Sequence, residues 1–402
     1  MPPEPGDPVV RYLELGLALG RHVDGLVDAY FGPPALAGRA AAGAPRAPRA
    51  IEHDLRLLLA DLEFDPDLEP DRRHWLQAQV RGLRVTAARL AGEAIGYADE
   101  VEACYGVRPT KVDEEVFAAA HRALDEVLPG TGPVRDRLIG WREAQAVPVD
   151  KLEAAVRSLA DDLRARTAER FGLPDGERVD FELVTDQPWS GFNYYLGDLR
   201  SRVAINTDLP VLATGLAHLV AHEAYPGHHT EHSRKEAGLV RRRNQLEETI
   251  FLVGTPQCLL AEGLADLAVE VAVSPEPEDQ AALTAGHLRP LGVGFDAEVA
   301  AVVARASDGL LGVRGNVGLL LHEEGRDPGD VVDYAARWGL LPPARAEKAV
   351  AFQTDPTWRA YVTCYVEGLP LCRGFVGGDP ARFERLLTEQ LTPDRLAADP
   401  RP

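Results

Sequence analysis

Apolar positions recur at helical spacing along most of this chain. Between residues 8 and 31 they return every three or four positions, Asp7 can cap the first turn and Gly32 can close the last. The same spacing predicts further helices at residues 51–62, 71–92, 112–127, 133–145 and 148–171. A stretch rich in Ala, Pro and Arg at 38–49 is expected to be a loop.

The pattern changes after Gly172. β-Branched and aromatic residues, punctuated by Pro, Gly and Asn, predict short strands at 181–185 and 201–207. Helical spacing then returns at 211–225, 229–252, 256–273, 279–287, 295–311, 328–337, 343–354 and after Pro380. We therefore expect a mainly α fold with one small sheet. It would form a single α-rich domain over 1–402, with an N-terminal helical lobe (1–175) and a second lobe (176–402).

Composition narrows the function classes. The 402 residues include 43 Lys and Arg against 63 Asp and Glu, a formal charge of −20 that opposes nucleic acid and anionic membrane surfaces. No run of about 18 uncharged apolar residues occurs, so no membrane span is expected. The first thirty residues lack the basic-then-apolar order of a signal peptide, which favours a cytoplasmic protein. The four cysteines show no CxxC spacing and are interpreted as buried apolar residues.

Residues 222–229 read HEAYPGHH, which begins like the HExxH motif of zinc proteases. In that motif two histidines four residues apart share one helix face and one zinc ion. Here Pro226 occupies the second histidine position, and the next histidines are His228 and His229. On a straight helix, His222 and His228 would be separated by about 9 Å and about 240°, so they could not meet at one ion.

A bend removes this difficulty. Pro226 has no N–H to bond the carbonyl of His222, and Gly227 tolerates backbone angles that other residues avoid. A helix that ends at Tyr225 could therefore turn and bring one of the following histidines back toward His222.

The third ligand is predicted downstream, in the apolar helical segment AEGLAD. Glu262 and Asp266 stand one turn apart there, and burying two acids is costly unless they have partners. A Glu that ligates the metal, followed by an Asp that orients a ligand histidine, is what a His-His-Glu zinc site requires.

Other histidines offer alternatives. His218 stands four residues before His222, so this pair has ligand spacing of its own, although His218 is also interpreted as a pocket or core residue. His232 is expected to face solvent. The second His-Glu pair, at 322–323, has Arg326 in the i+4 position and therefore lacks a ligand. The RRR run at 241–243 is interpreted as a solvated helix face.

The segments AHEAYPGHHTE and AEGLAD resemble the bacterial family known as domain of unknown function 885, whose members carry HExxPGHH and an EGxA helix. The second segment is also distantly similar to the glutamate helix of Glu-zincin metallopeptidases such as carboxypeptidase Taq and thermolysin. The resemblance covers most of the chain and is best at 186–375. It implies a large helical metallopeptidase-like fold with a small β-sheet beside the metal-site helices.

The resemblance also implies the residue roles. His222, His228 and Glu262 would bind one zinc ion, with other divalent metals possible, and Glu223 would be the general base. Asp266 would orient a ligand histidine. His229 stays open as the alternative to His228.

This chain departs from the family pattern in places. Leu264 stands where the family usually has an aromatic residue, and Glu231 where it has a glutamine-like one. Near the C-terminus, YVTCYVEGLPLCRG offers Tyr361, Tyr365 and Arg373 in place of a Gly-rich segment with Tyr and Lys.

Peptide hydrolysis also needs a donor for the oxyanion and contacts for the substrate. Tyr365 is the candidate donor, and Arg373 could hold a substrate carboxylate. The strand at 201–207 could pair at its edge with an extended peptide, with Asn206 near the scissile bond. We therefore expect a zinc metallopeptidase that cleaves short peptides. The alternatives are a metal-dependent hydrolase of another amide or ester, and a non-catalytic metal-binding helical protein.

Overall fold

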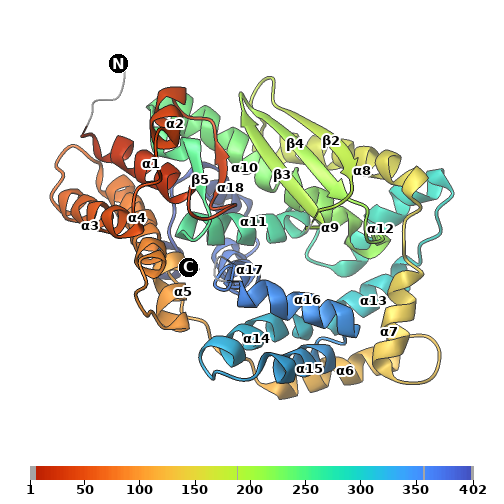
Figure 1. Cartoon of the computed structure of the whole chain (residues 1–402). Helices are drawn as coiled ribbons and strands as arrows, with labels where there is room; N and C mark the ends of the chain where they lie inside the picture. Colours follow the sequence, from red (N-terminus) through yellow and green to blue (C-terminus); the bar gives the residue numbers. More distant parts are fainter. Residues whose placement is uncertain (1–5, 188, 356–357, 400–402) are drawn as a thin grey trace.

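The computed structural model describes residues 6–187, 189–355 and 358–399 and confirms a mainly α fold (Figure 1). The helices of the first half are α1 (Pro8–Leu19), α2 (Pro34–Ala41), α3 (Pro48–Glu63), α4 (Pro70–Leu90), α5 (Tyr97–Tyr105), α6 (Glu114–Val127), α7 (Val134–Glu143) and α8 (Val149–Phe171). Those of the second half are α9 (Ala213–Glu223), α10 (His228–Lys235), α11 (Pro256–Ala272), α12 (Pro277–Leu288), α13 (Ala297–Ser307), α14 (Val313–His322), α15 (Pro328–Trp338), α16 (Pro343–Thr354), α17 (Val362–Val376), α18 (Pro380–Thr388) and α19 (Pro393–Ala398). Within this part of the chain, no helix is both long enough and apolar enough to cross a bilayer.

Short helical segments connect several of these elements. They are the π-helical η1 (Glu236–Arg241) and the 3₁₀ turns η2 (Leu246–Thr249), η3 (Arg289–Leu291) and η4 (Asp308–Gly312).

The strands form two small sheets. β2 (Arg178–Val184), β3 (Gly191–Gly197) and β4 (Arg200–Asn206) form a three-stranded sheet in the order β2-β4-β3. β4 lies in the centre, parallel to β2 and antiparallel to β3. The second sheet pairs β1 (Val27–Tyr30) with β5 (Ile250–Leu252) in antiparallel register. Both predicted strands therefore exist, and the sheet beside the HEAYPGHH segment gains a third strand, β3, between them in the chain.

Several predicted elements are wrong in type or length. The helix predicted over 8–31 ends at Leu19, and its last part is β1. The predicted loop at 38–49 holds the end of α2 and the start of α3. The helix predicted over 229–252 breaks into α10, η1, η2 and β5. Tertiary pairing explains the first and third of these errors, because β1 and β5 become strands only by bonding to each other. The helices α2, α5, α14 and α17 were not predicted.

The hydrophobic cores cross the expected lobe boundary near residue 175. Helices α1, α3 and α4 share a core with Ile250 and Leu252 of β5. Phe117 of α6 packs into a core built from α14, α15 and α16. Helix α8 packs with α9 and the three-stranded sheet. The N-terminal helices therefore enclose the C-terminal half from several sides, as Figure 1 shows for α1–α5 and α6–α8.

Helix α11 lies at the centre and packs closely on α17. A Cβ at Gly263 would lie 2.3 Å from the carbonyl oxygen of Gly368, and one at Gly368 would lie 2.8 Å from the carbonyl oxygen of Leu259. Only glycine therefore fits at this crossing. The close approach explains the glycine that follows Glu262, and it brings the tyrosines at the start of α17 toward that glutamate.

Candidate metal centre

The turn between α9 and α10 carries the HEAYPGHH segment. Helix α9 ends at Glu223, two residues earlier than predicted, and the peptide bond before Pro226 is cis. The N–H of Gly227 bonds back to a carbonyl of α9 at 2.9 Å. A Cβ at Gly227 would lie 2.0 Å from the carbonyl oxygen of His222, so only glycine fits this return of the chain. Helix α10 then begins at His228.

This turn brings three potential ligands together. The Nε2 atoms of His222 and His228 are 3.1 Å apart. The Glu262 carboxylate reaches both rings from α11, with Oε2 3.5 Å from His222 Nε2 and Oε1 3.7 Å from His228 Nε2. One ligand atom from each residue lies within 4.8 Å of the other two. Ligand atoms at 2.0–2.1 Å from a tetrahedral zinc ion would be separated by about 3.3 Å, so these spacings fit one zinc ion.

A buried oxygen without a partner supports this interpretation. Glu262 is 6% exposed, and its Oε2 has no hydrogen-bond partner in the described part of the chain. Its other oxygen accepts a hydrogen bond from the Tyr361 hydroxyl at 2.9 Å. Leaving a buried carboxylate oxygen unbonded costs free energy, and a bound cation between His222, His228 and Glu262 would remove that cost. The residues present therefore fit a divalent metal.

Asp266 lies where an orienting carboxylate is needed. Its Oδ1 is 2.9 Å from Nδ1 of His222, so a proton on Nδ1 leaves the Nε2 lone pair directed toward His228 and Glu262. His218 also reaches Asp266, with 3.5 Å between Nε2 and Oδ1. His218, His222 and Asp266 form a second group with ligand spacing. A neutral His222 has one free nitrogen lone pair, so it can be a ligand in only one of the two groups. The His218 side chain is 48% exposed, so the geometry favours the buried group of His222, His228 and Glu262.

His229 lies away from this centre. Its ring is completely buried, with Nδ1 2.8 Å from the Ser201 hydroxyl and Nε2 2.8 Å from Glu177 Oε2. Glu177 also accepts hydrogen bonds from Tyr225 and Arg164. Both nitrogens of His229 are therefore used to hold α10 against the sheet, and the second histidine of the centre is His228.

Burial and neighbouring charges shift the pKa values at the centre. Burial lowers the pKa of His228 to about 4, which keeps its ring neutral, as a metal ligand must be. Burial also acts to lower the pKa of His222, but the hydrogen bond to Asp266 and the negative charge of the nearby Glu262 raise it overall. Burial raises the pKa of Glu223 to about 7, and this effect exceeds the opposing effect of His222; the nearby Glu262 and Asp266 add to the rise. A carboxylate with this pKa is suited to accept a proton near neutral pH.

The sheet holds Glu223 in place from strand β3. The Asn193 side chain donates a hydrogen bond to the backbone carbonyl of Glu223 at 2.6 Å. A Cβ at Gly191 would lie 3.1 Å from Glu223 Oε1 and 2.7 Å from a Leu219 methyl group. The missing side chain at Gly191 therefore leaves room for the carboxylate at the start of β3.

The centre opens into a cavity of about 450 Å³. Its walls include the acids, histidines and tyrosines of the centre together with aromatic residues from four separate segments, namely Trp189, Phe192, Phe251, Phe352 and Trp358. Tyr365 lines this cavity and donates a hydrogen bond to the Tyr361 hydroxyl at 3.2 Å. His232 also lines it and stacks on Tyr195 with 4.8 Å between ring centroids. The prediction that His232 faces solvent is therefore wrong, because its ring on α10 lies against Tyr195 of β3 and Phe251 of β5.

The predicted substrate contacts are not in this cavity wall. Asn206 donates hydrogen bonds to the carbonyls of Gln187 and Trp189 and so fixes the loop before β3. Arg373 forms an ion pair with Glu270 on the surface. The predicted edge pairing of residues 201–207 is wrong, because this segment is β4, which is paired on both sides. The outer strand that borders the cavity is β3.

Some residues of the cavity gave no signal in the sequence. Asp28 lines it from β1, a segment that looked helical, and its place depends on pairing with a distant strand. Tyr361 is the direct partner of Glu262, whereas the sequence favoured Tyr365. The sequence carried only an indirect signal for Glu177. If one histidine of the pair His228 and His229 is buried away from the metal, it needs a buried polar partner, and Glu177 is that partner for His229.

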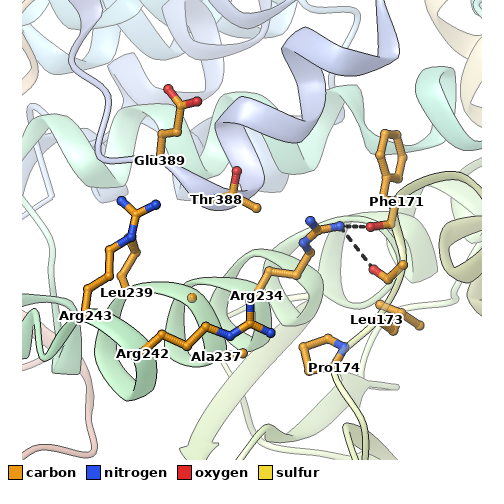
Figure 2. Close-up of a pocket in the computed structure, with 12 residues that line it drawn as sticks. Phe171, Leu173, Pro174, Arg234, Ala237, Leu239, Arg242, Arg243, Thr388 and Glu389 are labelled. Carbon is orange, nitrogen blue, oxygen red and sulfur yellow. Dashed lines mark hydrogen bonds between the residues drawn. The ribbon is translucent and has the colours of Figure 1, made fainter.

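A second cavity, of about 470 Å³, lies between the end of α8, η1 and the end of α18 (Figure 2). Arg234, Arg242 and Arg243 line it. The Arg234 guanidinium donates hydrogen bonds to the carbonyls of Phe171 and Gly172, as the dashed lines in Figure 2 show. Among the described residues, none lines both this cavity and the cavity of the metal centre.

Comparison with known proteins identifies the fold only. No family model and no curated protein matches the chain. A solved structure of a "putative lipoprotein" from Colwellia psychrerythraea is similar over 89% of this chain and 67% of that one, with 15% identity and a TM-score of 0.51. A second, of a "putative lipoprotein" of unknown function from Shewanella oneidensis, covers 90% of this chain and 75% of that one, with 12% identity and a TM-score of 0.48. The chain is thus similar in fold to the Colwellia protein, and the resemblance to the family known as domain of unknown function 885 stays a prediction.

Proposed function

We propose that this protein is a zinc-dependent metallohydrolase that cleaves short peptides. The observation that carries the proposal is the convergence of His222, His228 and Glu262, with one buried carboxylate oxygen left without a partner and with Glu223 beside it. The resemblance of the HExxPGHH and EGxA segments to the bacterial family, and more distantly to Glu-zincin peptidases, supports the same assignment. The cytoplasmic location stays a prediction.

His222, His228 and Glu262 would hold the ion, and Asp266 would keep the His222 ring in the required orientation. When bound, zinc would polarise the substrate carbonyl and lower the pKa of water. Glu223 accepts the proton of the attacking water and passes it to the leaving amine. Tyr361 and Tyr365, which line the same cavity, supply hydroxyl donors on the side of Glu262.

The cavity supports a short substrate. About 450 Å³ accommodates a few residues, and the aromatic walls favour apolar side chains. An extended peptide would pair with the backbone of β3, the outer strand at the cavity. These features fit a peptide, but another amide or ester of the same size would meet the same groups.

The decisive experiment compares wild type with Glu223→Gln in the zinc-loaded protein. We expect the variant to bind one zinc ion and to lose at least about 100-fold in turnover of short peptides, because the base is removed without changing the ligands. Glu153→Gln on the surface of α8 is the matched control and should keep full activity. Undiminished turnover by Glu223→Gln would contradict the mechanism. A library containing esters and other amides would separate a peptidase from a related hydrolase.

A further inference from the structure

Asp28 is a carboxylate that the proposed reaction does not use, although it lines the cavity of the metal centre. It lies on β1, where the pairing with β5 shifts register between Val27 and Ala29. A β-bulge of this kind places an extra residue and redirects its side chain. The residue that the bulge redirects is Asp28, so the local backbone directs this acid into the cavity.

The Asp28 carboxylate has no counter-charge in its surroundings. It makes no hydrogen bond or ion pair with any residue of 6–187, 189–355 and 358–399. Burial raises its pKa to about 7, and the nearby Glu262 and Glu223 add to the rise. The described cavity wall contains several acids but no Lys or Arg. This part of the cavity therefore favours a cationic group on the molecule that enters it.

The metal does not account for this acid. Asp28 belongs to neither of the residue groups whose atoms are close enough to share one ion. Zinc bound by His222, His228 and Glu262 would leave Asp28 without a partner. A cationic group on a bound substrate would supply the partner that the Asp28 carboxylate lacks.

The cavity walls indicate what carries that cation. Trp189 and Phe192 lie with ring centroids 5.5 Å apart on one side, and Phe352 stacks on Trp358 at 6.0 Å on another. Aromatic faces accept both apolar side chains and ammonium groups. An amino terminus has a pKa of about 7.7–8.0, so it is mostly protonated at neutral pH.

We propose that Asp28 binds the free amino group of the substrate, which makes the site selective for short peptides with an unblocked amino terminus and an apolar first residue. This rests on the proposed function, because it assigns a substrate class to the same centre. Asp28 is then a specificity-determining residue, and Glu223 keeps the role of the base.

The test measures binding without turnover. Glu223→Gln protein, with and without one equivalent of zinc, is titrated calorimetrically with phenylalaninamide and with N-acetylphenylalaninamide. We expect the free amine to bind at least 10-fold more tightly than the acetylated compound. Adding Asp28→Asn, which keeps the size of the side chain, should abolish that preference and leave the affinity for the acetylated compound unchanged.

Asp24→Asn is the matched control, because Asp24 is exposed in the connection just before β1. It should keep the preference for the free amine. Equal binding of the two compounds by the Glu223→Gln protein would overturn the inference, and so would an undiminished preference in the Asp28→Asn protein. Hydrolysis of peptides by wild type with no dependence on Asp28 would reject this inference and keep the proposed function. A preference that depends on Asp28 in a protein that hydrolyses no peptide would do the reverse.

Discussion

Two of the cavities in this protein, the one at the metal centre and the one lined by arginines, have nearly the same volume but differ in how their charged side chains are paired. In the cavity between α8, η1 and α18, Arg234 bonds two backbone carbonyls and the Glu384 carboxylate. Arg242 and Arg243 are exposed there and have no partner in the described chain. Exposed arginines remain hydrated, so their lack of a partner costs little. The charges of this cavity are either used in structure or solvated.

The cavity of the metal centre contains acidic side chains that are neither paired within the structure nor fully solvated. Glu262 and Glu223 are buried, one oxygen of Glu262 has no partner, and Asp28 has none at all. Burying such groups costs stability, and that cost persists where the groups serve binding or chemistry. The pairing of the charged groups, rather than the size of the cavity, therefore distinguishes the candidate functional site from the other cavity.

The largest expected effect is on metal binding. His222→Ala, His228→Ala and Glu262→Ala should each abolish stoichiometric zinc binding, since each removes a direct ligand. Removing a residue that only orients a ligand lowers metal affinity roughly 10- to 100-fold, and the loss of a ligand must exceed that. Elemental analysis and zinc titration of the purified variants measure this.

His218→Ala and Arg243→Ala should keep the zinc. His218→Ala tests whether the alternative group of His218, His222 and Asp266 binds the ion. Arg243→Ala is the control from the arginine-lined cavity, which should not affect zinc binding. Loss of zinc in His218→Ala together with its retention in His228→Ala would move the centre to the alternative group.

A smaller effect is expected from Glu177, the buried acid that holds His229. Burial acts to raise its pKa, but hydrogen bonds from His229, Tyr225 and Arg164 lower it overall. Glu177→Gln should destabilise the fold by about 2 kcal/mol at neutral pH, because a charged hydrogen-bond acceptor is lost. Urea unfolding at several pH values measures the difference.

The pH dependence follows from the lowered pKa. The ionised Glu177 stabilises the fold fully above its unfolded pKa near 4.5, and this contribution disappears as the pH falls through the lower folded value. The gap between wild type and Glu177→Gln should therefore narrow in acid. A difference in stability that grows in acid would contradict the proposed hydrogen-bond network around Glu177. The control is Glu182→Gln on the neighbouring strand β2, where the side chain is partly exposed; it should have the same stability as wild type at each pH.

The smallest effects concern the arginine cavity and sharpen the comparison. Arg234→Ala should cost about 1–2 kcal/mol of stability, because the carbonyls at the end of α8 lose their donor. Arg242→Ala should change stability by less than about 0.5 kcal/mol, as expected for an exposed side chain. Thermal unfolding measures both. A large destabilisation by Arg242→Ala would show that its charge is used in structure after all.

Local patterns in the sequence determined a large part of this picture. The helical spacing predicted most helices, since amphipathic periodicity reports directly on which face is buried. The Pro226-Gly227 turn was predictable, because a missing N–H and a missing Cβ act on neighbouring backbone atoms. The pair Glu262 and Asp266 stood out, because two acids in an apolar helix need partners.

Only the tertiary structure decided the remaining features, because they depend on contacts between segments far apart in the chain. Ser201 and Glu177 hydrogen-bond both ring nitrogens of His229, so His228 is the histidine that lies at the candidate metal centre. Pairing of β1 with β5 turns a segment that looked helical into a strand and places Asp28 in the cavity. Pairing on both sides removes β4 as an edge. A periodic pattern reports how each element is buried, but not which element buries it.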